Sequence, residues 1–130
     1  MNDQFSVQKA IYAVLVGANI CDGRVYDHVP QEATFPFVRI GEMTATTADV
    51  IGNNGAVEFI DLHTWARDQR GQKETKEIMA AMHDALHTQQ FAIAGKQFAL
   101  AEVIGQRTLL DPDGVTYHGV LTVRIESYEE

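Results

Sequence analysis

The chain has 130 residues, of which 45% are hydrophobic, and carries a formal net charge of −8. This length and apolar content fit one globular domain spanning residues 1–130, and no apolar run is long enough to cross a membrane. The acidic balance argues against a free-standing DNA-binding domain, because such domains grip phosphates through a basic patch. Cys21 is the only cysteine, so no internal disulfide is expected and folding in a reducing, cytoplasmic compartment is the natural expectation.

The N-terminal third predicts a helix followed by a connection and a strand. Within residues 4–18 the apolar side chains recur at three- and four-residue steps, which gathers them on one stripe of a helix. This pattern also lacks the basic start and unbroken apolar stretch of a signal peptide. Residues 20–35 are mostly a connection that contains Pro30, and residues 37–40 after Pro36 read as a strand.

The middle of the chain holds a polar segment and a strand that is apolar on both faces. The segment Met43–Gly55 ends in Gly-Asn-Asn-Gly, a strong turn signal, and is either a long loop or a protruding hairpin. In the strand predicted over 56–65, alternate residues of both sets are apolar, and such a strand needs cover on both faces. A neighbouring subunit could supply the second cover, and so could a locally thicker monomer core.

The C-terminal half predicts a second helix over 72–87 and then a strand hairpin. Asp111–Gly114 is a turn, because proline presets its backbone angle and glycine tolerates the left-handed one. The final strand, 115–127, alternates cleanly, and its inward side chains are expected to be Val115, Tyr117, Leu121, Val123 and Ile125. The order helix, strand, strand, helix, strand, strand predicts an α+β fold, with a mainly antiparallel sheet of about four strands and two helices packed on one face.

No constellation of residues points to catalysis, so no catalytic, cofactor-binding or metal-ligating residue is predicted. His83 and His87 lie four residues apart on the second predicted helix, as a helical zinc site requires, but no third ligand follows from the sequence. A small metal-binding domain or enzyme that uses this pair, with His63 or His118 as a further ligand, stays as an alternative. Cys21 has no histidine or asparagine beside it in the sequence and is expected to be a structural thiol.

Three stretches together resemble a known family. They are Val25–Pro30 continuing into Phe35–Gly41, the strand from Phe59 that ends in Trp65-Ala66-Arg67, and Gly71 with the helix behind it. In this order and spacing they resemble the phage tail-completion, or tail-terminator, family, which includes versions in gene transfer agents. The resemblance covers nearly the whole chain.

The resemblance implies a structural virion protein, assembled in the host cytoplasm, that forms a six-fold ring at the head-proximal end of the tail. Its implied partners are further copies of itself, the tail tube protein and the head connector, with DNA passing through the lumen without specific binding and no membrane involved. Another head–tail connector or a tail-tube subunit is the alternative within the same particle. The polar segment and the strand behind it supply the predicted subunit-interface residues, which are Met43, Thr44, Thr46, Asp49, Asn53, Asn54, Phe59, Trp65 and Arg67.

Overall fold

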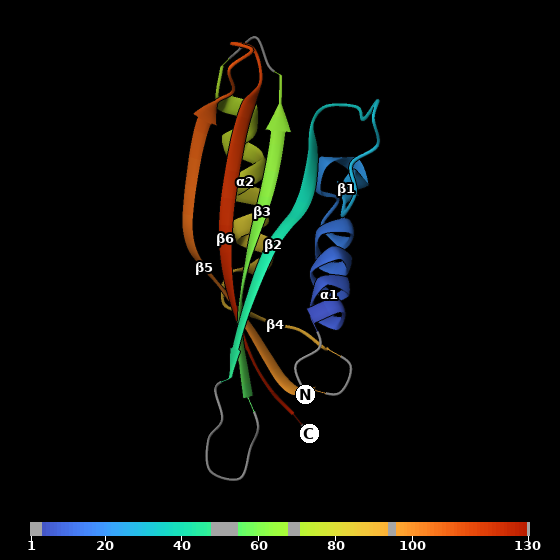
Figure 1. Cartoon of the computed structure of the whole chain (residues 1–130), viewed down its shortest axis with the longest axis vertical. Helices are drawn as coiled ribbons and strands as arrows, with labels where there is room; N and C mark the ends of the chain where they lie inside the picture. Colours follow the sequence, from blue (N-terminus) through green and yellow to red (C-terminus); the bar gives the residue numbers. More distant parts are fainter. Residues whose placement is uncertain (1–3, 48–54, 68–70, 94–95, 130) are drawn as a thin grey trace.

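A computed structural model describes residues 4–47, 55–67, 71–93 and 96–129. These residues form one twisted, six-stranded sheet in the order β1-β2-β3-β6-β5-β4, with both helices on the same face (Figure 1). The elements are α1 (Gln4–Gly17), a short 3-10 turn η1 (Ile20–Gly23), β1 (Val25–Tyr26), β2 (Phe37–Thr47), β3 (Gly55–Ala66), α2 (Lys73–Leu86), β4 (Gln89–Gln90), β5 (Lys96–Leu110) and β6 (Tyr117–Glu129).

The predicted α+β class and the placement of both helices on one face are confirmed, but the number of strands needs correction. Four long strands, β2, β3, β6 and β5, are antiparallel as expected. Two short strands extend the sheet to six: β1 pairs parallel with β2, and β4 pairs antiparallel with β5. Each has only two residues, which is too short to leave a period in the sequence, so only its partner strand determines it.

One hydrophobic core lies between the helices and the sheet. From α1 it takes the fully buried Val7, Ile11 and Leu15, and from α2 it takes Met79, Met82 and Leu86. The central strands face them with side chains that are also fully buried: Ile60, Leu62, Leu121, Val123 and Ile125. The inward face predicted for the last strand is therefore right over its central part.

The start of that last strand differs from the prediction. Val115 is 58% exposed, whereas Thr116, expected to point outward, is buried. The reason is the turn that precedes β6. The Oδ1 atom of Asp113 accepts the backbone N–H groups of Val115 and Thr116, each at 2.9 Å, and the Thr116 hydroxyl donates to Oδ2 at 2.6 Å. These bonds extend the turn by two residues, so the strand begins at Tyr117.

The polar middle segment is a hairpin rather than a long loop. β2 continues to Thr47 and β3 begins at Gly55, with Thr47 opposite Ala56; residues 48–54 lie outside the described part of the chain. Between the pairs Ile40–Leu62 and Met43–Ile60 the register shifts, so Gly41 and Glu42 form a β-bulge. A bulge bends its strand and redirects side chains, and this one shapes the site described next.

Candidate subunit interface on the open face of the sheet

The sheet has an open face, the side opposite the two helices, and β3 places a row of large side chains on it. Along β3 the buried residues alternate with the half-buried Val57, Phe59, Asp61, His63 and Trp65. The buried set points into the core, so the half-buried set lies on the open face. This arrangement confirms that the strand carries apolar residues on both faces, and neither helix packs on the second face (Figure 1).

Aromatic rings form a row across three strands at one end of the open face. Phe37 of β2 lies opposite Trp65 of β3, which lies opposite His118 of β6. Their ring centroids are 5.4 Å and 4.5 Å apart, and Phe35 extends the row with its centroid 5.1 Å from that of Phe37. Large, stiff side chains in such a row are typical of protein–protein contact surfaces, because they bury much area at little cost in conformational entropy.

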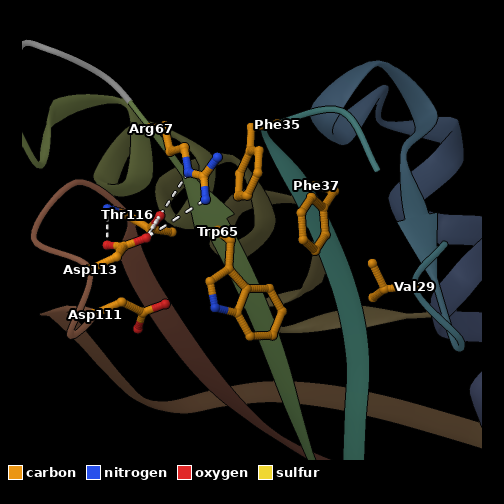
Figure 2. A pocket seen from close by; sticks show the side chains of 8 residues that line it. All are labelled: Val29, Phe35, Phe37, Trp65, Arg67, Asp111, Asp113 and Thr116. Carbon is orange, nitrogen blue, oxygen red and sulfur yellow. Dashed lines mark hydrogen bonds and ion pairs between the residues drawn. The ribbon is translucent and has the colours of Figure 1, made fainter. Parts of the chain in front are cut away.

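A groove of about 310 Å³ runs beside this row (Figure 2). Its lining residues are Val29, Phe35, Phe37, Trp65, Arg67, Asp111, Asp113 and Thr116. The Arg67 guanidinium carbon lies 4.2 Å from the centre of the Phe35 ring, and its Nε donates to the Thr116 hydroxyl at 2.8 Å. Its terminal nitrogen also lies 3.7 Å from Asp113, so Arg67 bridges the aromatic wall and the acidic wall.

The acidic wall of the groove is held by hydrogen bonds. The Thr116 hydroxyl, together with the backbone N–H groups of Val115 and Thr116, lowers the pKa of Asp113 to about 2. Asp113 is therefore ionised at neutral pH and keeps the turn in one shape. The groove consequently presents a fixed carboxylate opposite its aromatic rings.

A line of four titratable side chains crosses the open face next to the aromatic row. The Oε2 atom of Glu42 lies 3.0 Å from Nε2 of His63, whose Nδ1 lies 2.8 Å from Nε2 of His118. The Nδ1 atom of His118 lies 3.9 Å from Oδ1 of Asp111. The bond from His63 lowers the pKa of Glu42, while burial, and then the neighbouring His63, lower the pKa of His118.

The structure brings together most of the predicted interface residues that it describes. Thr44 and Thr46 lie opposite Phe59 and Val57. Phe59 and Trp65 lie on the same face of β3, and Trp65 and Arg67 line the groove toward the other end of that strand. Met43 is different, because it is half-buried against the core. The predicted residues Asp49, Asn53 and Asn54 lie outside the described part of the chain.

The predicted interface omitted four residues of this surface, namely Phe35, Phe37, His63 and His118, of which the two histidines had been named only for the metal-binding alternative. The alternation of β3 and β6 already places both histidines on the outer face, so strand period is a signal that could have found them. That alternation does not predict which strands pair with each other in the sheet.

The histidine pair at the end of α2 offers little to a metal ion. The helix ends at Leu86 rather than at residue 87 as predicted, so His83 lies in its last turn and His87 is its extended C-cap residue. The rings of His83 and His87 stack with their centroids 4.6 Å apart. The backbone N–H of Val103 donates to Nδ1 of His87 at 3.0 Å, so the neutral ring carries its proton on Nε2 and has no free lone pair. This contact explains His87 as a structural acceptor for the neighbouring strand.

Comparison with known proteins gives the family. The family model described as tail completion protein gp17 matches residues 6–126. The chain belongs to the tail completion protein gp17 family. The tail completion protein gp17 of Bacillus phage SPP1 is 28% identical over 90 residues, covering 69% of this chain and 66% of that protein. The fold is similar to a chain in the virion of a native gene transfer agent particle, with a TM-score of 0.81, 20% identity and 94% of both chains covered.

Membership of the tail completion family makes this chain a structural protein of the virion tail and not an enzyme. The open face of the sheet carries large half-buried side chains on β3 and the groove beside them. Among the described helices, none is long and apolar enough to cross a membrane.

Proposed function

We propose that the chain assembles head-to-tail into a ring, with six copies as its expected number, at the head-proximal end of the tail. The ring ends growth of the tail tube and joins the tail to the head connector. Family membership supports a role in tail completion, and the observation that carries the ring is the pair of free strand edges on opposite sides of the sheet.

The first free edge belongs to β5. The short β4 pairs only with Leu100 and Ala101, so from Ile104 to Leu110 no described strand pairs with the outer edge. Ile104, Leu109 and Leu110 on this edge are 52%, 38% and 50% exposed. A long edge strand with exposed apolar side chains is a template for pairing with another chain unless something covers it.

The second free edge belongs to β2. The short β1 pairs only with Val38 and Arg39, and no described strand pairs with the outer edge from Gly41 to Thr47. Two different edges on opposite sides of one sheet favour a heterologous contact, which generates a ring when the rotation between copies closes. If the edge of β5 in one copy pairs with the edge of β2 in the next copy, both free edges gain a strand partner.

The predicted interface residues lie next to the β2 edge. Met43, Thr44 and Thr46 belong to the edge strand itself, and Phe59 lies opposite Thr44 on β3. Trp65 and Arg67 lie farther along, where Phe37 of β2 is opposite Trp65. We assign these residues, together with the undescribed Asp49, Asn53 and Asn54, to contacts between neighbouring copies. The net charge of −8 suits a ring whose lumen lets DNA slide through without specific binding.

The molar mass of the purified chain in solution, with two variants, tests the ring. Leu110→Lys places a charge on the free β5 edge, and Val115→Lys adds the same charge to a similarly exposed residue of the neighbouring turn. We expect the wild type and Val115→Lys to form rings and Leu110→Lys to stay monomeric with an unchanged circular dichroism spectrum. Equal assembly of both variants would overturn the assigned edge.

The role in the particle is tested by removing the protein during assembly. We expect tails of abnormal length and tails detached from capsids. Particles that contain no tails at all would instead assign the chain to the tube itself, and normal tails firmly attached to capsids would refute the proposal.

A further inference from the structure

The bulge in β2 is fitted closely around one edge of the His63 ring. A Cβ atom on Gly41 would lie 2.6 Å from Cδ2 and 2.7 Å from Nε2 of His63. Real Cβ atoms essentially never come this close to another atom, so only glycine allows the ring to sit here. The next residue of the bulge, Glu42, places Oε2 3.0 Å from the same Nε2 atom.

A third potential ligand completes a cluster around this nitrogen. One ligand atom from each of Glu42, Asp61 and His63 lies within 4.8 Å of the other two. No other group of three such residues occurs in the described part of the chain. The Thr122 hydroxyl donates to Oδ1 of Asp61 at 2.7 Å, which orients the carboxylate and uses one of its two oxygens.

When both histidines are neutral, the side chains Glu42, His63, His118 and Asp111 have one hydrogen too few for the contacts between them. Ionised carboxylates only accept hydrogen bonds, so Glu42 accepts the N–H of His63 Nε2. The Nδ1 atom of His63 then accepts from Nε2 of His118, and the remaining lone pair of His118 faces the Asp111 carboxylate at 3.9 Å. Two electron-rich groups therefore face each other at the far end of the line.

A cation bound to Nε2 of His63 gives every contact between these four side chains either a bound cation or a donated hydrogen. His63 then carries its proton on Nδ1 and donates to His118, whose own proton moves to Nδ1 and faces Asp111. A metal-bound histidine usually donates its other N–H to a carboxylate, a backbone carbonyl or a water. Here Nε2 of His118 accepts that N–H, and the Asp111 carboxylate lies behind His118.

We propose that Glu42, Asp61 and Nε2 of His63 form a binding site for a divalent transition-metal cation, with Zn²⁺ as its best probe. One imidazole and two carboxylates suit Zn²⁺ better than Mg²⁺, which prefers oxygen ligands alone. Glu42 is 65% exposed and can close on the ion, and the two carboxylates outweigh Arg39, which lies 3.7 Å from Glu42. The site does not depend on ring formation.

Titration calorimetry with ZnCl2 on the full chain at pH 7.5 tests the site. We expect one Zn²⁺ per chain for the wild type, none for His63→Gln, and about tenfold weaker binding for His118→Gln, which loses only the outer support. His83→Gln is the matched control, because His83 is a partly exposed histidine on the other side of the molecule, and it should bind like the wild type. The same titration with MgCl2 should show no binding.

Two further measurements keep the result unambiguous. If His63→Gln does not fold, Glu42→Gln changes an exposed side chain and should still abolish or strongly weaken Zn²⁺ binding. Long-range ¹H–¹⁵N spectra of the wild type should show the His63 proton on Nδ1 after Zn²⁺ is added. No Zn²⁺ binding, binding that His83→Gln removes, or a proton shift that acid alone produces would overturn the proposal.

Discussion

Replacing Gly41 with alanine tests whether the bulge in β2 is held by close packing against β3. An added Cβ would lie 2.6–2.8 Å from two atoms of the His63 ring and from the backbone oxygen of Asp61, whereas ordinary contacts begin at 3.4 Å. The ring can swing away, but the Asp61 oxygen belongs to a strand that is paired on its other side with Thr122. To restore an ordinary contact with that oxygen, from 2.8 to 3.4 Å, the strands must separate by roughly 0.6 Å.

The expected loss of stability follows from this overlap. Overpacking of this kind costs about 1–3 kcal/mol, and alanine returns about 0.5–1 kcal/mol because it restricts the unfolded chain more than glycine does. We expect Gly41→Ala to lower the free energy of unfolding by about 1–2 kcal/mol and Tm by roughly 4–8 °C. Urea unfolding followed by circular dichroism measures the change in the free energy of unfolding. The protein concentration must be the same for both proteins, because assembly adds to the apparent stability.

A second glycine provides the control for this experiment. Gly105 lies beside the register shift in β5, and an added Cβ there would meet nothing within 4 Å. We expect Gly105→Ala to leave stability unchanged or raise it by up to about 1 kcal/mol. If Gly41→Ala is as stable as Gly105→Ala, the close approach of the bulge to His63 and Asp61 is not what shapes this part of the sheet.

Three further predictions concern the core, the thiol and the groove. Leu121 is fully buried in the central strand β6, so Leu121→Ala should lower the free energy of unfolding by about 2–5 kcal/mol in a urea titration. Burial raises the pKa of the Cys21 thiol to about 11, so it should react with a maleimide far more slowly at pH 7.5 in the folded chain than in urea, and equal rates would contradict its burial. Thr116→Val should raise the pKa of Asp113, measured by carboxyl NMR, from about 2 toward 3.8. Because that pKa is depressed, the contribution of Asp113 to stability is present above about pH 4 and lost as the pH falls toward 2. An unchanged Asp113 pKa in the variant would show that Thr116 does not cause the shift.

Much of the fold could be predicted because the spacing of apolar residues within each segment indicates a helix or a strand. The helical stripe through Val7 and Ile11 and the alternation through Leu121 and Val123 each repeat within a few residues, so the elements could be assigned without knowing their partners. The order and spacing of the three family-like stretches could also be recognised in the sequence, and the family match confirms the resemblance. The absence of any catalytic motif agreed with a structural role.

Other features depend on which strands become neighbours, and no local period carries that information. His63 and His118 are 55 residues apart and meet only because β3 and β6 pair in one particular register. The bulge at Gly41 packs closely against the His63 ring of the neighbouring strand, and the two-residue strand β1 exists only as a partner of β2. The residues by themselves therefore determined the helices, most of the long strands and the family. The continuation of β2 to Thr47, the groove and the line of histidines and carboxylates were decided by tertiary pairing, since contacts between distant segments form only once the sheet has set their register.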